Sequence, residues 1–175
     1  MKYTPLPEAL FTYNRERFAQ ELPVGSLAIF HSNDLMPRSG DTFFTFRQNS
    51  DLFYLCGIEQ EETVLMLFPA CPKRGFDEVL FIRRPTEKLI RYEGEQLSKQ
   101  KASRRSGIEK VLYLDQYEDI LRELMLLSEQ VYVNQDEHDR FKSPVLTRNQ
   151  RMAQDLLKQY PGHVFHRSGP ILKRN

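Results

Sequence analysis

The feature that most restricts the fold of this chain is a series of short apolar runs separated by glycine and proline. Each run has four to six residues, a length typical of strands. Turn signals follow at Gly57, at Pro69-Ala70-Cys71-Pro72 and at Gly75. The pattern therefore predicts a set of consecutive strands at Leu27–Phe30, Asp51–Cys56, Thr63–Phe68 and Glu78–Arg83.

The rest of the chain alternates strand and helix patterns. Strands are predicted at Val111–Leu114, Gln130–Asn134 and His163–Arg167. Apolar residues recur at helical spacing in Pro7–Leu22, Tyr117–Leu127 and Thr147–Tyr160. Strands in sequence followed by alternating strands and helices predict an α/β fold, with a single mixed β-sheet flanked by helices.

Length and composition restrict the function classes. The 175 residues suit one domain, and the longest apolar stretch, Val64–Cys71, is far shorter than the roughly 20 residues of a membrane span. A net charge of +1 gives no field toward nucleic acid or an anionic membrane. Cys56 and Cys71 are interpreted as buried apolar residues rather than a disulfide or metal pair. We therefore expect no membrane or nucleic-acid partner. Because the first twenty residues contain no apolar segment of a secretory signal, we also expect a cytoplasmic protein.

A search for a self-contained active site finds little. The chain contains no phosphate loop, no Gly-x-Ser-x-Gly and no His-Glu-x-x-His motif. His163 and His166 would face opposite sides of a strand, so a shared metal is not expected. Two polar segments, Asp136-Glu137-His138-Asp139 and Ser98–Gly107, are interpreted as a solvated turn and a solvated surface helix or loop.

The most distinctive segment is Phe46-Arg47-Gln48-Asn49-Ser50-Asp51-Leu52-Phe53-Tyr54-Leu55-Cys56-Gly57. Its five polar residues lead directly into an apolar run that ends at glycine. Asp51 or Ser50 can bind nearby backbone N–H groups at the start of the predicted strand. Arg47 offers a planar fork for a carboxylate or a cluster of carbonyls. The pattern alone favours a structural corner over a ligand site.

This segment resembles a motif of the N-terminal domain of aminopeptidase P, the Xaa-Pro aminopeptidases of the creatinase, or pita-bread, superfamily. The motif reads approximately Tyr/Phe-Arg-Gln-Asn-Ser-Asp-Phe-x-Tyr-Leu-x-Gly-Phe. Pro23–Ala28 and Glu59–Phe68 are similar to the strands that flank it, and Tyr92-Glu93-Gly94 lies where the family has Trp-x-Gly. The resemblance covers about residues 8–170. It implies a creatinase/prolidase N-terminal-domain-like fold with a ribonuclease H-like motif.

The resemblance also implies a division of labour. In the family, a C-terminal pita-bread domain holds two metal ions, usually manganese, and cleaves the bond before proline. Residues 1–168 then correspond to the N-terminal domain, and residues 169–175 to the start of a linker helix toward a catalytic domain missing from this chain. We expect no catalytic residue, no metal and no cofactor in this chain, and no activity from the chain alone.

Family members use this domain to form a homo-oligomer, a dimer or tetramer, and to restrict access of peptide substrate to a neighbouring subunit's site. Asp41 matches an acidic residue near the substrate α-amine, and the alternative is a loop cap. Tyr92 matches the aromatic of the Trp-x-Gly element, and the alternative is ordinary packing; tyrosine replaces tryptophan there and Ile90 replaces the usual glutamate. The remaining matches, interpreted as mainly structural, are Arg47, Gln48, Asn49, Ser50, Asp51, Tyr54, Gly57 and Gly94.

Two alternatives remain at this stage. The chain could be the same domain of a prolidase, which cleaves only dipeptides, or a non-catalytic module that binds peptides or proteins on this fold. The longer match to Gln48-Asn49-Ser50-Asp51 favours the aminopeptidase over the prolidase.

Overall fold

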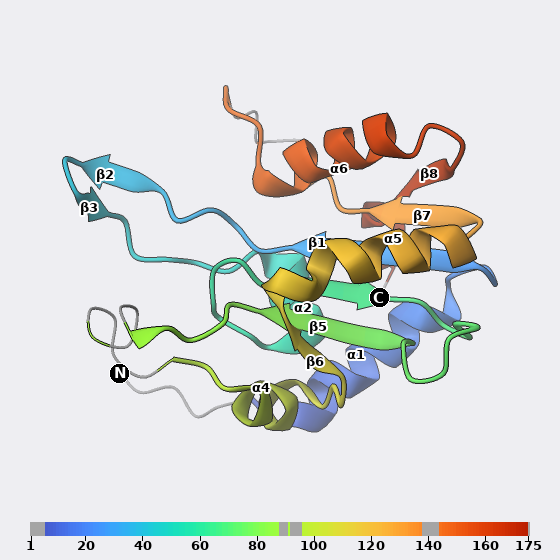
Figure 1. The fold of residues 1–175 in the computed structure, drawn as a ribbon, viewed down its shortest axis with the longest axis horizontal. Coiled ribbons are helices and arrows are strands. Elements are labelled where there is room, and N and C mark those ends of the chain that lie inside the picture. The colour runs from blue at the N-terminus through green and yellow to red at the C-terminus, as the bar shows by residue number, and fades with distance from the viewer. Residues whose placement is uncertain (1–5, 88–90, 92–95, 138–143, 175) are drawn as a thin grey trace.

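A computed structural model of the chain describes residues 6–87, 91, 96–137 and 144–174. The fold is a six-stranded sheet with helices on both faces, together with a small separate hairpin (Figure 1). The strands are β1 (Ser26–His31), β2 (Pro37–Ser39), β3 (Thr42–Phe43), β4 (Val64–Leu67), β5 (Glu78–Ile82), β6 (Val111–Tyr113), β7 (Gln130–Val133) and β8 (Val164–Arg167). The helices are α1 (Glu8–Gln20), α2 (Ser50–Cys56), α4 (Lys99–Ser106), the 3₁₀ turn η1 (Leu114–Gln116), α5 (Tyr117–Leu127), α6 (Arg148–Gln159) and α7 (Gly169–Leu172).

The main sheet has the strand order β6-β5-β4-β1-β7-β8 and is mixed. Strand β4 pairs antiparallel with both β1 and β5, while β1–β7, β7–β8 and β5–β6 are parallel pairs. Only β4 therefore runs against the other strands of this sheet. The predicted α/β fold with a single mixed sheet flanked by helices is confirmed.

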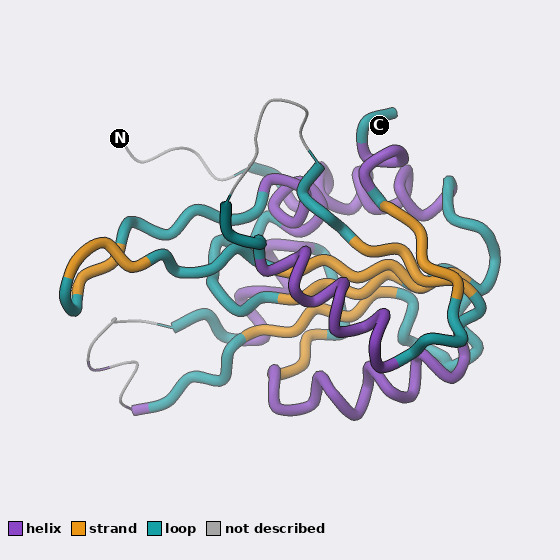
Figure 2. The backbone as a smooth tube through the Cα atoms, turned by 90° about the horizontal axis from the view of Figure 1, so that it is seen from above, coloured by secondary structure: helices purple, strands orange, loops and turns teal. Residues whose placement is uncertain are grey.

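Alternating residues of the central strands supply two separate cores, because successive side chains of a strand point to opposite faces. Ala28 and Phe30 of β1 pack with α1, α2 and α4, whereas Leu27 and Ile29 pack with α5 and α6. All six residues of β1 are buried. Figure 2 shows helices on both sides of the strands, as a sheet with two buried faces requires.

One predicted element is wrong in type: Asp51–Cys56 is not a strand but lies in helix α2. Its buried residues Leu52, Leu55 and Cys56 follow helical spacing, and the segment contains no β-branched residue. The Asn49 side chain caps the first turn. Gly57 ends the helix in a left-handed conformation, φ +66°, with its N–H bonded to the Phe53 carbonyl at 2.8 Å.

Ser98–Gly107, interpreted as a solvated surface helix or loop, forms a helix whose Gln100, Lys101, Arg104 and Arg105 are exposed. It contains α4, and this helix buries Ala102 and Ser106 on one side.

The buried Arg15 of α1 joins the helices around it. Its Nη1 donates to the carbonyls of Leu55 at 2.9 Å and Ser106 at 2.8 Å, the ends of α2 and α4, and its Nε lies 3.0 Å from Glu78. A cation is favoured at a helix C-terminus, and the Arg15 guanidinium binds carbonyls at the C-terminal ends of both α2 and α4.

The junction between α2 and α1 gives a test of this packing. A Cβ at Gly57 would lie 2.3 Å from Cε2 of Phe11, and the positive φ adds backbone strain. We expect Gly57→Ala to lower the free energy of unfolding by about 2–4 kcal/mol, measured by urea denaturation. Gly40→Ala is the control, because its φ is also positive but no atom lies within 4 Å. An equal loss in both variants would contradict the packing argument.

Candidate functional site

The first component of the site is a hairpin that sequence patterning did not predict. Strands β2 and β3 pair only with each other in the described chain and project beyond one end of the main sheet (Figure 1). Asp41 lies at the turn after Gly40, which has φ +56°, and Thr42 Oγ1 donates to the Ser39 carbonyl at 2.6 Å. Asp41 is exposed, and its carboxylate has no hydrogen bond or ion pair to a described residue. The turn therefore presents a free negative charge away from the body of the domain.

The polar motif that precedes α2 forms the second component. Asn49 Oδ1 accepts from the N–H groups of Asp51 and Leu52, both at 3.1 Å, and so caps the helix. Gln48 Nε2 donates to the carbonyls of Ile58 and Gln60, both at 3.0 Å, beyond the helix's other end. Asn49, rather than Ser50 or Asp51, is therefore the residue that anchors the start of this segment.

The Asp136 carboxylate joins this motif to other elements. Its Oδ1 accepts from Asn49 Nδ2 at 2.7 Å and from Asn149 Nδ2 at 3.0 Å. Asn149, the second residue of α6, accepts the His31 N–H through Oδ1 at 3.0 Å and thereby holds the end of β1. The solvated turn predicted for this segment is thus wrong at Asp136, which is half-buried and hydrogen-bonded, while His138 and Asp139 lie outside the described residues.

Asp51 makes a second link to the loop after β7. Asn134 Nδ2 donates to Asp51 Oδ2 at 2.8 Å, and Asn134 Oδ1 accepts the Asp136 N–H at 3.0 Å. The second bond closes a turn in which Asp136 has φ +52°. Burial raises the pKa of the Asp51 carboxyl above its usual value, and the Asn134 hydrogen bond acts against this increase. The network fixes one end of the sheet to both α2 and α6.

An apolar groove lies where the hairpin meets the start of α6. Its volume is about 290 Å³, and its walls include Met36, Phe44, Phe46, Val145 and Leu146. The bidentate ion pair between Arg151 and Asp34, at 2.8 and 2.9 Å, lies at its edge. Arg47, the first polar residue of the motif, lines this groove and does not join the Asp136 network.

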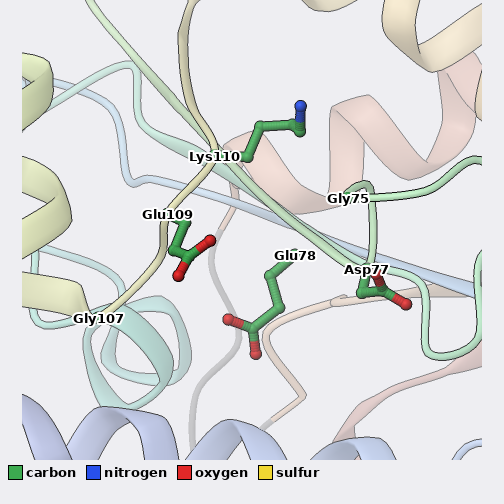
Figure 3. A pocket seen from close by; sticks show the side chains of 6 residues that line it. All are labelled: Gly75, Asp77, Glu78, Gly107, Glu109 and Lys110. Atoms are coloured by element: carbon green, nitrogen blue, oxygen red, sulfur yellow. The ribbon is translucent and has the colours of Figure 1, made fainter.

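A larger hollow at another part of the sheet is acidic. It has a volume of about 530 Å³ and is lined by Gly75, Asp77, Glu78, Gly107, Glu109 and Lys110. Figure 3 shows the carboxylates of Glu78 and Glu109 directed toward the same space, with Lys110 directed away from it. Glu78 is already paired with Arg15. We therefore assign this hollow no binding role.

The other residues singled out from the sequence are dispersed. Tyr54 accepts Asn14 Nδ2 at its carbonyl, 2.8 Å, between α2 and α1, and Ser50 is exposed. His163 Nε2 lies 2.8 Å from the Met125 carbonyl, whereas the His166 ring stacks on Tyr132 with 4.9 Å between centroids. Ile90, Tyr92 and Gly94 lie outside the described residues. The gating role predicted for Tyr92 stays a prediction.

Two findings concern function classes. Across the described ranges, no group of three or more His, Cys, Asp or Glu residues is arranged to hold a metal ion. No helix in the same ranges combines the length and apolar character that crossing a membrane requires.

Sequence reasoning missed Asn134, Asp136 and Asn149 as partners of the motif. Their spacing gives one local signal, because Asn134-x-Asp136 is typical of a side-chain-stabilised turn. The contacts to Asn49 span 87 residues for Asp136, so only folding brings them together. The hairpin also had a signal, Ser39-Gly40-Asp41, which is typical of a tight turn.

Comparison with known proteins gives a consistent set of similarities. The family model described as "Aminopeptidase P, N-terminal domain" matches residues 11–132. The Escherichia coli Xaa-Pro aminopeptidase is 27% identical over 128 residues, which cover 73% of this chain and 29% of that enzyme. The Saccharomyces cerevisiae protein Intermediate cleaving peptidase 55 is 42% identical over 65 residues, 37% of this chain and 13% of its own length.

Solved structures show the same fold. A Bacillus anthracis structure assigned as an aminopeptidase P superposes with a TM-score of 0.83 and 24% identity, over 95% of this chain and 39% of that one. The chain therefore spans well under half the length of the relatives it matches.

The Asp136 network can be tested through its central amide. Asn49→Ala removes the cap of α2 and the shortest hydrogen bond to the Asp136 carboxylate. We expect the free energy of unfolding to fall by about 2–4 kcal/mol in urea denaturation, because a capping bond and a bond to a charged group are both lost. Ser50→Ala, at the exposed next position, should change it by no more than about 0.5 kcal/mol. A loss below about 1 kcal/mol at Asn49 would show that the network is not essential.

Proposed function

Because the chain belongs to the family of aminopeptidase P N-terminal domains, we propose that it is the non-catalytic N-terminal domain of a metal-dependent Xaa-Pro aminopeptidase. Such an enzyme removes the first residue from peptides with proline in the second position. The observation that carries the proposal is the match of residues 11–132 to the family model. The E. coli relative is named an Xaa-Pro aminopeptidase, which favours this activity over that of a prolidase.

The proposal places the chemistry in a C-terminal catalytic domain of the same polypeptide, with two manganese ions. Such a metal pair supplies an activated water and stabilises the oxyanion that forms at the scissile carbonyl. The described residues do not fit this metal pair, because they contain no suitable ligand cluster. The role left to this domain is assembly and control of access. A cytoplasmic location is also part of the proposal.

Asp41 is the residue through which we propose that the domain meets the substrate. Its carboxylate lies at the turn of a projecting hairpin and is free of partners within the described chain. A projecting hairpin suits contact with a neighbouring subunit of a homo-oligomer, a dimer or tetramer. There, a carboxylate can form a charge-assisted hydrogen bond with the protonated α-amine of a peptide.

Because the proposal places catalysis in a separate domain, it predicts that this chain alone is inactive. The 175-residue chain, incubated with manganese and an Xaa-Pro peptide, should release no N-terminal residue above a metal-only blank in a chromatographic assay. The reason is that the described residues cannot assemble a metal pair. Turnover that a chelator abolishes and that persists through repurification would overturn the proposal.

The role of Asp41 predicts a change in substrate binding. In a full-length aminopeptidase carrying this domain, Asp41→Ala should raise KM for Xaa-Pro peptides about tenfold, because one bond to a charged amine is lost. Metal content and oligomeric state should be unchanged. Asp119→Ala is the matched control, since Asp119 is an exposed aspartate on α5, whose side chain is 83% exposed. An unchanged KM at Asp41 would exclude the amine-binding role.

A further inference from the structure

The apolar groove at the base of the hairpin has exposed apolar walls to which the proposed activity gives no role. Several of its wall residues are large, apolar and exposed: Met36 is 54% exposed, Phe44 56%, Val145 63% and Leu146 45%. They come from two segments about 100 residues apart that meet only in the folded chain. Contiguous exposed apolar side chains around a hollow mark an interaction site more often than a random surface.

The groove also carries unbalanced positive charge. Arg47 and Arg148 both line it, and neither guanidinium has a hydrogen bond or ion pair to any residue in the described ranges. The Nε atom of Arg148 is buried without a partner. Asp34, the acidic residue of the lining, is already neutralised by its two bonds to Arg151.

Arg47 and Ser50 are the polar residues of the sequence motif whose side chains make no hydrogen bond to a described residue. Gln48, Asn49 and Asp51 make hydrogen bonds inside the domain, whereas Arg47 lies exposed at the groove. Its backbone carbonyl accepts from Asn33 Nδ2 at 3.0 Å, so the backbone there is held while the side chain stays available. A held backbone with a free guanidinium is suited to bind a carboxylate, since guanidinium groups match carboxylates in a planar, two-bond geometry.

These observations indicate which kind of ligand the groove can bind. The groove, at about 290 Å³, lies just below the range of about 300–1,000 Å³ for ligand sites, which suits a short segment of a chain. Two unpaired guanidinium groups repel the protonated amine of a peptide substrate, so this groove and Asp41 bind opposite charges. We propose that the groove binds a segment of a different protein chain in which a carboxylate side chain stands between apolar side chains, with the carboxylate on Arg47 and Arg148.

The proposal is independent of the aminopeptidase assignment and can be tested on this chain. The probe is the peptide acetyl-Leu-Glu-Phe-amide, titrated into the ¹⁵N-labelled chain and followed by NMR. We expect shifts centred on residues 33–36, 44–47 and 145–148. The peptide acetyl-Leu-Gln-Phe-amide should bind roughly three- to tenfold more weakly, because it lacks the carboxylate, and acetyl-Leu-Lys-Phe-amide should not shift these residues.

Matched variants separate the groove from general surface charge. Arg47→Gln should weaken binding of the glutamate peptide roughly three- to tenfold and remove its advantage over the glutamine peptide. Arg74→Gln, at an exposed arginine outside the groove, should leave binding unchanged. Far-UV circular dichroism of both variants checks that they remain folded.

Several outcomes would overturn the proposal. Equal binding of all three peptides, or shifts centred elsewhere, would show that the groove does not select a carboxylate. Equal shifts with sodium acetate would reduce the site to a small-anion site. Dimerisation of the chain in sedimentation, abolished by Phe44→Ser, would assign the groove to a second copy of this chain.

Discussion

The Asp136 carboxylate is the contact on which the functional end of this domain depends. It binds the amide that caps α2 and the amide near the start of α6, and the latter amide also holds the last residue of β1. A half-buried carboxylate needs such donors, and the N-terminal ends of two helices are a favourable place for its charge. Because α2 and α6 are fixed through this group, the hairpin between β1 and α2 starts and ends at defined positions.

The turn of the hairpin and the groove at its base carry opposite charges. Asp41 at the turn carries a free negative charge, and Arg47 and Arg148 in the groove carry free positive charges. The proposed binding of a peptide amine at Asp41 and of an acidic protein segment in the groove would use these opposite charges. This separation suits a domain whose proposed role is to contact other parts of an assembly rather than to catalyse.

Segments with regular periodicity were predicted correctly, whereas the motif segment was not. Tyr117–Leu127 forms α5 with the predicted bounds, because its apolar stripe and its local propensity agree. Asp51–Cys56 was predicted as a strand since a short apolar run ending at glycine fits either structure. Asn49 and Gly57 were cap signals in the sequence, but their meaning depends on whether the segment between them is helical.

Periodicity and a contiguous motif are enough to predict the α/β class, the six strands of the main sheet and the family, although the same pattern wrongly adds a strand at Asp51–Cys56. The sequence also contains every residue of the candidate site, but it does not show which of them are in contact. Folding was needed to bring the Asp136 carboxylate between the amides of Asn49 and Asn149, and to complete the groove beside Arg47 with residues 145–148. Those contacts join segments distant along the chain, and the energy of pairing buried polar groups is defined only once the fold has brought them out of water.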